Sequence, residues 1–285
     1  MKSTPAPPQP DTASPGSGPY LYWTGCAANY DARIAAVVKA TVKVLRSAGV
    51  ELTFLGEEEV CSGDAARRLG EEGLFQQLAL QNIDTLKRHG VERIVTHCAH
   101  CFHMLKNEYP RFGGAFEVTH HSELIARVLR ENRLRLKTGD QPLTTLHDSC
   151  YVGRYNRIFD APREILKAVQ GGDMVEMPRH REQSFCCGAG GANYWFDAPK
   201  KEPAGVIRIR EAVQTGARVV AAECPFCIKM LEQGAQAVAG SQELKIRDIS
   251  EIVADALVED EVGAHVAAPA VSDDRQANAP RKERA

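Results

Sequence analysis

The sequence has no long apolar run, no recognisable export signal and no excess of charge of either sign. No apolar stretch approaches the roughly 20 residues that a membrane-spanning helix needs, so we expect no membrane span. The 35 basic and 37 acidic residues leave a formal net charge of −2, which gives no electrostatic reason to expect a nucleic acid or an anionic membrane as the partner. These absences predict a cytoplasmic protein in a reducing compartment, where disulfides are rare.

The two ends of the chain lack the large apolar residues of a packed core. Residues 1–18 are rich in proline and have no apolar stretch of signal-peptide length, which is typical of a flexible lead. Residues 259–285 are mainly small, charged or proline residues. Segments of this composition bury too little apolar surface to fold. We predict that both segments are disordered.

No cysteine is left over when the nine cysteines are divided into two matching sets. The first set is Cys26, Cys61, Cys98 and Cys101, and the second is Cys150, Cys186, Cys187, Cys224 and Cys227. Counted through Cys61 and Cys186, the intervals are 35, 37 and 3 residues in the first set and 36, 38 and 3 in the second. These agreements indicate two related halves. In a reducing compartment, metal or redox-cofactor ligation is a better use for the thiols than disulfides.

Short apolar runs alternate with amphipathic helical segments in both halves, and this order predicts parallel sheets covered by helices. The predicted strands are Leu21–Trp23, Leu52–Leu55, Arg93–Thr96, Glu117–Thr119, Thr144–Leu146, Met174–Met177, Val219–Ala222 and Leu244–Ile246. Functional groups of such sheets gather beyond the carboxyl ends of the strands. We therefore predict an α/β fold of two repeated cysteine-rich halves, 19–139 and 140–258. Each is a small parallel sheet flanked by helices, with its cysteines at the carboxyl ends of the strands.

The second set supplies five thiols, one more than a closed tetrahedral zinc site needs, and this number favours a polynuclear metal centre. Cys224 and Cys227 open a predicted helix, whose N-terminus favours thiolate charge. Alone, such a pair is equally typical of a redox dithiol, a zinc half-site or an iron–sulfur half-site. Gly188 directly follows Cys186 and Cys187. It either lets the backbone approach a cluster and donate N–H groups to sulfur, or only forms a turn.

These motifs resemble the cysteine-rich CCG domain of the B-type subunit of heterodisulfide reductase and of the iron–sulfur subunits of glycolate, lactate and glycerol-phosphate oxidoreductases. The resemblance covers both halves. The stretches CSGDAARRLGEEGLFQQLALQN, IVTHCAHCFHMLKNEYPRFGG, HDSCYVGRYNRIFDAPREILKA and SFCCGAGGANYW are similar to the C-terminal part of larger oxidoreductases related to the D-type subunit of the same enzyme, which often work beside electron-transfer flavoprotein. The resemblance implies a non-cubane [4Fe–4S] cluster bound by Cys150, Cys186, Cys187, Cys224 and Cys227, with Gly188 in the cofactor-binding loop.

The first half departs from this family pattern. Ser62 stands where the second cysteine of the adjacent pair would be, and Ala99 replaces the proline usual in the Cys-Pro-His-Cys version of the later pair. The remaining thiols of Cys26, Cys61, Cys98 and Cys101 suffice for a conventional cubane [4Fe–4S] cluster, which we hypothesise there. Structural zinc needs the same number of thiols, and an empty, vestigial site is the third interpretation.

Histidines near the predicted strand ends are candidates to donate hydrogen bonds to thiolates or cluster sulfur. They are His97, His100, His103, His120, His121 and His147. A single histidine at such a place is more often a structural residue. His100 is the best placed to tune a cluster, because it is enclosed by Cys98 and Cys101.

The sequence has no cysteines for an additional ferredoxin motif and no glycine-rich dinucleotide fingerprint in a suitable context. We therefore predict an iron–sulfur electron-transfer subunit of a heterodisulfide reductase-like or flavoprotein-linked complex, passing electrons between a flavoprotein and a thiol/disulfide or quinone-side acceptor. The expected partners are electron-transfer flavoprotein, a flavin dehydrogenase or a ferredoxin-like subunit, with any membrane association through a partner. One alternative is a disulfide reductase acting directly at the second-half cluster. The other is a zinc-stabilised interaction module without redox chemistry.

Overall fold

The computed structural model describes residues 18–139, 141–172, 174–196 and 202–258. The predicted disorder of 1–18 and 259–285 lies outside the described residues, apart from Gly18. Across the described ranges, no helix is both long and apolar enough to span a membrane.

The first half contains a four-stranded parallel sheet in the order β2-β1-β3-β4. Its strands are β1 (Tyr20–Trp23), β2 (Leu52–Thr53), β3 (Arg93–Thr96) and β4 (Glu117–His120). Its α-helices are α1 (Ala27–Tyr30), α2 (Ala32–Ser47), α3 (Asp64–Leu69), α4 (Glu72–Arg88), α5 (Ala99–His103) and α6 (His121–Arg130). A π-helical turn at Met104–Glu108 follows α5, and short 3₁₀ turns lie at Gly56–Glu58 and Tyr109–Phe112.

The second half contains a three-stranded parallel sheet in the order β5-β6-β7. Its strands are β5 (Thr144–Leu146), β6 (Val219–Ala222) and β7 (Lys245–Asp248). Its α-helices are α7 (Gly153–Asn156), α8 (Asp160–Gln170), α9 (Ala204–Gln214), α10 (Pro225–Ala235) and α11 (Ile249–Ala256), with 3₁₀ turns at Arg181–Gln183 and Asn193–Trp195. The α/β fold of two repeated halves with small parallel sheets is thereby confirmed.

The predicted strand Met174–Met177 is wrong. Only Val175 pairs with the sheet, through a single parallel bridge to Thr145 and one backbone hydrogen bond of 3.1 Å to the carbonyl of Thr144. This segment lies at the sheet edge, and Pro178, which has no N–H group, follows it directly. The matching edge strand of the first half, β2, is also only two residues long, as is common for edges protected from further pairing.

The long helix α2 shows how local sequence positions these elements. Asp31 caps its N-terminus by accepting a hydrogen bond of 2.9 Å from the backbone N–H of Arg33. Ile34, Val37, Thr41 and Leu45 recur on one face of the helix and are buried. The helix ends before Gly49, whose positive φ of 69° favours glycine. A strand, a cysteine loop and an amphipathic helix thus follow one another as the pattern predicts.

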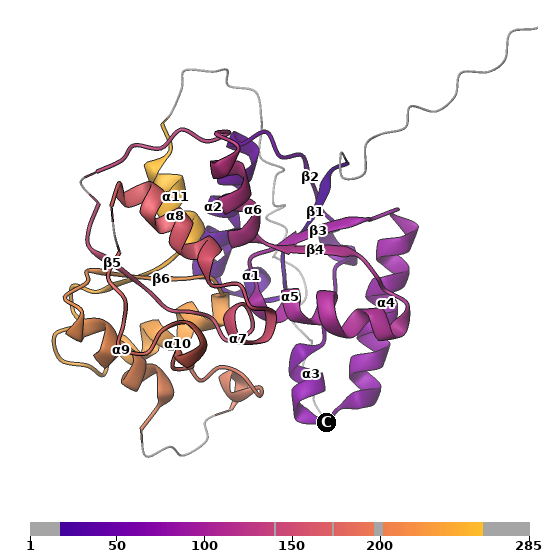
Figure 1. The fold of residues 1–285 in the computed structure, drawn as a ribbon. Coiled ribbons are helices and arrows are strands. Elements are labelled where there is room, and N and C mark those ends of the chain that lie inside the picture. Colours follow the sequence, from indigo (N-terminus) through magenta and orange to yellow (C-terminus); the bar gives the residue numbers. More distant parts are fainter. Residues whose placement is uncertain (1–17, 140, 173, 197–201, 259–285) are drawn as a thin grey trace, which may run out of the picture.

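The two halves join through four helices, α2, α6, α8 and α11 (Figure 1). Helix α2 packs on α11 and α6 packs on α8, which is the reciprocal arrangement expected of a repeat. Tyr22 and Val95 of the first sheet and Leu146 and Ala221 of the second belong to the same buried cluster. The halves therefore share one hydrophobic core, and a change at their junction affects both.

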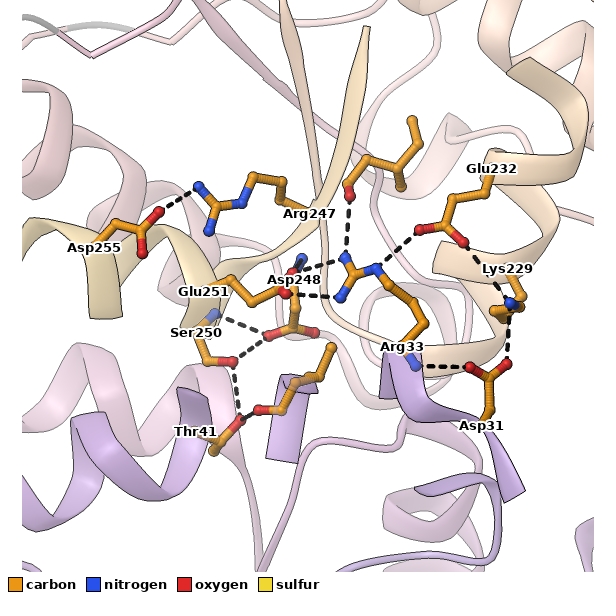
Figure 2. Close-up of polar contacts among 12 residues, drawn as sticks. Asp31, Arg33, Thr41, Lys229, Glu232, Arg247, Asp248, Ser250, Glu251 and Asp255 are labelled. Atoms are coloured by element: carbon orange, nitrogen blue, oxygen red, sulfur yellow. Dashed lines mark hydrogen bonds and ion pairs between the residues drawn. The ribbon is translucent and has the colours of Figure 1, made fainter. Parts of the chain in front are cut away.

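Arg33 of α2 anchors the polar part of this junction (Figure 2). Its guanidinium donates to both carboxylate oxygens of Glu251 at 2.7 and 2.8 Å, and to Glu232 at 2.9 Å. Nearby, the hydroxyl of Thr41 donates to that of Ser250 at 2.9 Å. The bidentate pair fixes direction as well as distance, since the planar guanidinium matches the carboxylate.

The repeat is also visible in how α6 and α11 begin. His120 and Glu123 form a capping box at α6, and Asp248 and Glu251 form the same box at α11. Asp248 also accepts a hydrogen bond of 3.0 Å from His121 of the other half, and both side chains are fully buried. This hydrogen bond therefore links the N-termini of α6 and α11 across the two halves.

Candidate metal centres

Cysteines of both sets lie at the carboxyl ends of parallel strands, as the alternating pattern predicts, whereas Cys186 and Cys187 follow a segment with only the Val175 bridge. Cys26 follows β1 and Cys150 is reached a few residues after β5, while Cys98 and Cys224 are the N-cap residues of α5 and α10. All nine cysteines are free thiols. The geometry leaves them available as ligands.

The first set gathers around short sulfur contacts. The sulfur atoms of Cys26 and Cys61 lie 4.0 Å apart, and the backbone N–H of Gly63 donates to Cys61 Sγ at 3.4 Å. The hydroxyl of Ser62 lies 3.4 Å from Cys101 Sγ. Ser62 therefore points into the set.

The second set repeats these contacts with a thiol in place of the hydroxyl. The backbone N–H of Gly188 donates to Cys186 Sγ at 3.4 Å, and Cys187 Sγ lies 3.3 Å from Cys227 Sγ. Gly188 has a φ of 94°, and a Cβ there would lie 2.9 Å from the Cβ of Ala204. This left-handed turn lets the sulfurs of Cys186 and Cys187 face one site. Ser62 accordingly occupies the place that Cys187 has in the second half.

Each set contains at least one thiol that is more acidic than an ordinary cysteine. A hydrogen bond from Cys26 lowers the pKa of Cys61 to about 6. Hydrogen bonds from Cys150 and then Cys187 lower the pKa of Cys186 strongly. Since the thiolate is the form that binds metal, both halves offer a ligand already deprotonated near neutral pH.

The two sets meet at Cys224. Burial disfavours its thiolate, but hydrogen bonds from Cys227 and Cys98 outweigh burial and lower the pKa of Cys224. Nδ1 of His100 lies 3.5 Å from Cys224 Sγ, and the His100 ring packs edge-on against Phe226 at a centroid distance of 4.7 Å. The sequence places His100 between the two cysteines of its own half. Its ring instead reaches the thiol of the other half.

The remaining candidate histidines divide into distinct groups. A ring nitrogen of His147 lies within 4.8 Å of the thiols of Cys187 and Cys227, so His147 belongs to the second set. His103 stacks on Tyr151 at a centroid distance of 4.7 Å, beside the sets. The others are fully buried in the junction between the halves, and they are His97, His120 and His121.

Burial keeps the rings of His147 and His97 in the same, neutral protonation state. Burial first, and then the neighbouring Arg208, lower the pKa of His147 to about 3. Burial lowers the pKa of His97 to about 4. Both rings are therefore neutral at physiological pH, and each neutral ring has one N–H donor and one nitrogen acceptor.

Two site residues escaped the sequence interpretation. Ser149 places its hydroxyl 3.5 Å from Cys227 Sγ, and Arg208 donates to His147 at 3.1 Å. Arg208 comes from the middle of α9 and has no exposed surface. A charged residue on an amphipathic helix predicts a solvated face, so no local signal marks Arg208 as part of the site.

A pocket opens onto the first set and not onto the second. Cys26, Cys61 and Cys101 line it from the first half, and Tyr194, Trp195 and Phe226 line it from the second. The Trp195 ring is about half exposed at 47%. The thiols that the sequence marked as the incomplete set are thus the ones facing this aromatic pocket.

A doubled α/β body with adjoining thiol sets at its strand ends defines a cysteine-rich repeat protein. The chain belongs to the CCG cysteine-rich domain family, whose model matches residues 20–106 and 144–232. It is 41% identical over 239 residues to the "Probable iron-sulfur-binding oxidoreductase FadF" of Bacillus subtilis. It is 37% identical over 241 residues to the "EtfAB:quinone oxidoreductase" of Syntrophomonas wolfei.

A third relative is a subunit of a heterodisulfide reductase. The chain is 33% identical over 254 residues to the D-type subunit of the dihydromethanophenazine:CoB--CoM heterodisulfide reductase of Methanosarcina barkeri. These matches cover 84%, 82% and 87% of this chain but 34%, 34% and 61% of the relatives. The chain thus spans about a third of the length of the first two.

Proposed function

We propose that this chain is an iron–sulfur electron-transfer module with a redox centre at each thiol set. It passes electrons between a flavoprotein and a thiol/disulfide or quinone-side acceptor. The observation that carries this function is the junction of the two sets, where Cys224 Sγ lies 3.5 Å from Nδ1 of His100, the residue between Cys98 and Cys101. Electrons entering one set are within direct reach of the other.

The cysteine thiols of the two sets are suitable ligands for iron–sulfur clusters. Cys150, Cys186, Cys187, Cys224 and Cys227 would hold a [4Fe–4S] cluster of the non-cubane kind, and Cys26, Cys61, Cys98 and Cys101 would hold a cubane [4Fe–4S] cluster or zinc. When bound, such a cluster supplies a one-electron carrier. The chain contributes acidic thiols at Cys61 and Cys186 and backbone N–H donors at Gly63 and Gly188.

The relatives support the choice of partners. Their names include an iron–sulfur-binding oxidoreductase, an EtfAB:quinone oxidoreductase and a heterodisulfide reductase component. We assign electron-transfer flavoprotein or a flavin dehydrogenase as the donor, with a ferredoxin-like subunit as a further partner. Free thiols of this number fit a reducing compartment, and we assign the chain to the cytoplasm.

Anaerobic purification with the native partners tests this function. We expect a brown protein with acid-labile sulfide and about four irons at each occupied set. Reduced electron-transfer flavoprotein should bleach its visible absorption. A colourless protein with stoichiometric zinc and no sulfide would show instead a metal-stabilised interaction module.

A second candidate function is direct disulfide reduction at the second-half set. Cys150 and Cys186 are half-buried, whereas the other thiols of this set are fully buried, so a small substrate can reach these two sulfurs. Each disulfide takes up two electrons from the reduced protein and two protons from water and gives two thiols. We expect turnover of a low-molecular-weight disulfide by the isolated, reduced protein if this function holds. Electron uptake from flavoprotein without such turnover rejects it.

A further inference from the structure

His147 has two ring nitrogens in opposite surroundings. Nδ1 lies 3.1 Å from the Nε–H group of Arg208. Nε2 is buried and has no hydrogen-bond partner among the described residues. The whole side chain has no exposed surface. Buried polar groups are rarely left without partners, so this nitrogen requires one.

Arg208 decides which nitrogen carries the proton. Its guanidinium is always charged and can only donate hydrogen bonds. It is held in place by Glu211 at 2.7 Å and by the backbone carbonyl of Arg179 at 2.7 Å. Nδ1 of His147 must therefore accept, and the proton of the neutral ring must lie on Nε2.

The proton on Nε2 decides whether His147 acts as a metal ligand or as a hydrogen-bond donor. A ring nitrogen of His147, Cys187 Sγ and Cys227 Sγ all lie within 4.8 Å of one another, a spacing that would also suit a metal ligand. A ligating Nε2 needs a free lone pair, which would move the proton to Nδ1. That proton would then face the N–H group of Arg208. Two donors cannot share one hydrogen bond, so His147 is suited to donate and not to ligate.

We propose that His147 is a positioning residue whose free Nε2–H would donate to a sulfur of the cluster held by the second thiol set and would raise the reduction potential of that cluster. The inference rests on the proposed iron–sulfur function. A hydrogen bond to thiolate or cluster sulfur stabilises the added negative charge of the reduced state, so its presence makes reduction easier. Arg208 acts through His147 by fixing the tautomer.

The first half has a buried N–H donor at the position equivalent to His147. Trp23 stands three residues before Cys26, as His147 stands three residues before Cys150. Its Nε1 is also buried without a hydrogen-bond partner among the described residues. An indole nitrogen can only donate, and Trp23 packs in the same cluster as Cys98 and Cys101. An N–H donor at the same place in each repeat is what a shared tuning role requires.

A redox titration of the His147→Leu protein, monitored by electron paramagnetic resonance, tests the proposal. We expect the midpoint potential of the second-half centre to shift to a more negative value. His147→Gln keeps an N–H donor and should recover part of the shift. His89→Leu removes an exposed imidazole that pairs with Glu58 and should leave the potential unchanged. An unchanged potential in His147→Leu overturns the inference.

A second measurement leaves His147 in place, so it stands even where His147→Leu does not fold. In the His100→Leu protein labelled with ¹⁵N-histidine, which lacks the other ring close to this set, electron–nuclear double resonance should show a weakly coupled nitrogen and a coupled proton that exchanges in D₂O. The strong nitrogen coupling of a directly bound ligand, or no coupled histidine proton, contradicts the donor role. Absence of iron and sulfide from wild type would instead refute the proposed function itself.

Discussion

Cys187→Ser should abolish the second-half centre while leaving the first in place. The sulfur of Cys187 lies 3.3 Å from that of Cys227 and donates a hydrogen bond to Cys186, so its loss removes a ligand and an internal contact together. Serine is a poor ligand for iron because its hydroxyl stays protonated at neutral pH. We expect the protein to retain about half of its iron and sulfide and to lose the paramagnetic signal of the second set.

The first half already has a serine at the position equivalent to Cys187, and this allows the reverse substitution to be tested. Ser62 already occupies this position in the first half, with its hydroxyl 3.4 Å from Cys101. Ser62→Cys restores a fifth thiol there, and a second copy of the second-half signal is the expected gain. Ser149→Ala is the matched control, because it removes a hydroxyl 3.5 Å from Cys227 without removing a thiol. A Cys187→Ser protein with an unaltered second-half signal contradicts the assignment of five thiols to one centre.

Strands covered on both faces were predictable from the sequence, and edge strands were less so. Arg93–Thr96 and Val219–Ala222, which have neighbouring strands on both sides, are strands with the predicted bounds, since an apolar run between polar boundaries leaves few alternatives. Leu52–Leu55 is shortened to two residues, and Met174–Met177 is reduced to one bridge. Edge pairing depends on which neighbour the sheet offers, and that is a tertiary property.

The cysteine spacing divides the thiols into two sets but does not predict the contacts between the sets. His100 and Cys224 are 124 residues apart, and they meet only because α2 packs on α11 and α6 on α8. Arg208 reaches His147 across 61 residues. No periodicity within either half encodes these approaches. The approach of His100 to Cys224 follows from the docking of two amphipathic helix pairs, and that of Arg208 to His147 follows from the packing within the second half. The sequence pattern specifies neither register.

Asp248→Ala should destabilise the whole molecule by about 3–5 kcal/mol. The carboxylate is fully buried and accepts hydrogen bonds from the backbone N–H of Ser250 at 2.8 Å, its hydroxyl at 2.7 Å and His121 Nε2 at 3.0 Å. Alanine removes the cap of α11 and leaves His121 without a partner for either ring nitrogen. The midpoint of denaturant unfolding, followed by far-ultraviolet circular dichroism, measures the change.

Asp255→Ala is the matched control on the same helix (Figure 2). Its side chain is 63% exposed and pairs with Arg247 at the surface, so a loss below about 1 kcal/mol is expected. An equal loss of stability in Asp248→Ala and Asp255→Ala would contradict the role assigned to the buried pair of Asp248 and His121.

The pH dependence gives a second, independent signature of Asp248. Burial opposes its charged form, but attraction to His121 and the hydrogen bonds from Ser250 outweigh burial and lower the pKa of Asp248. A depressed folded-state pKa contributes stability that is fully present above the ordinary carboxyl value of about 4 and is lost as pH falls toward the folded value. The difference in the free energy of unfolding between wild type and Asp248→Ala should therefore become smaller at acidic pH. Because the Asp248–His121 hydrogen bond joins α11 of the second half to α6 of the first, the same variant should also weaken the magnetic interaction between the two reduced centres, which Asp255→Ala should leave intact.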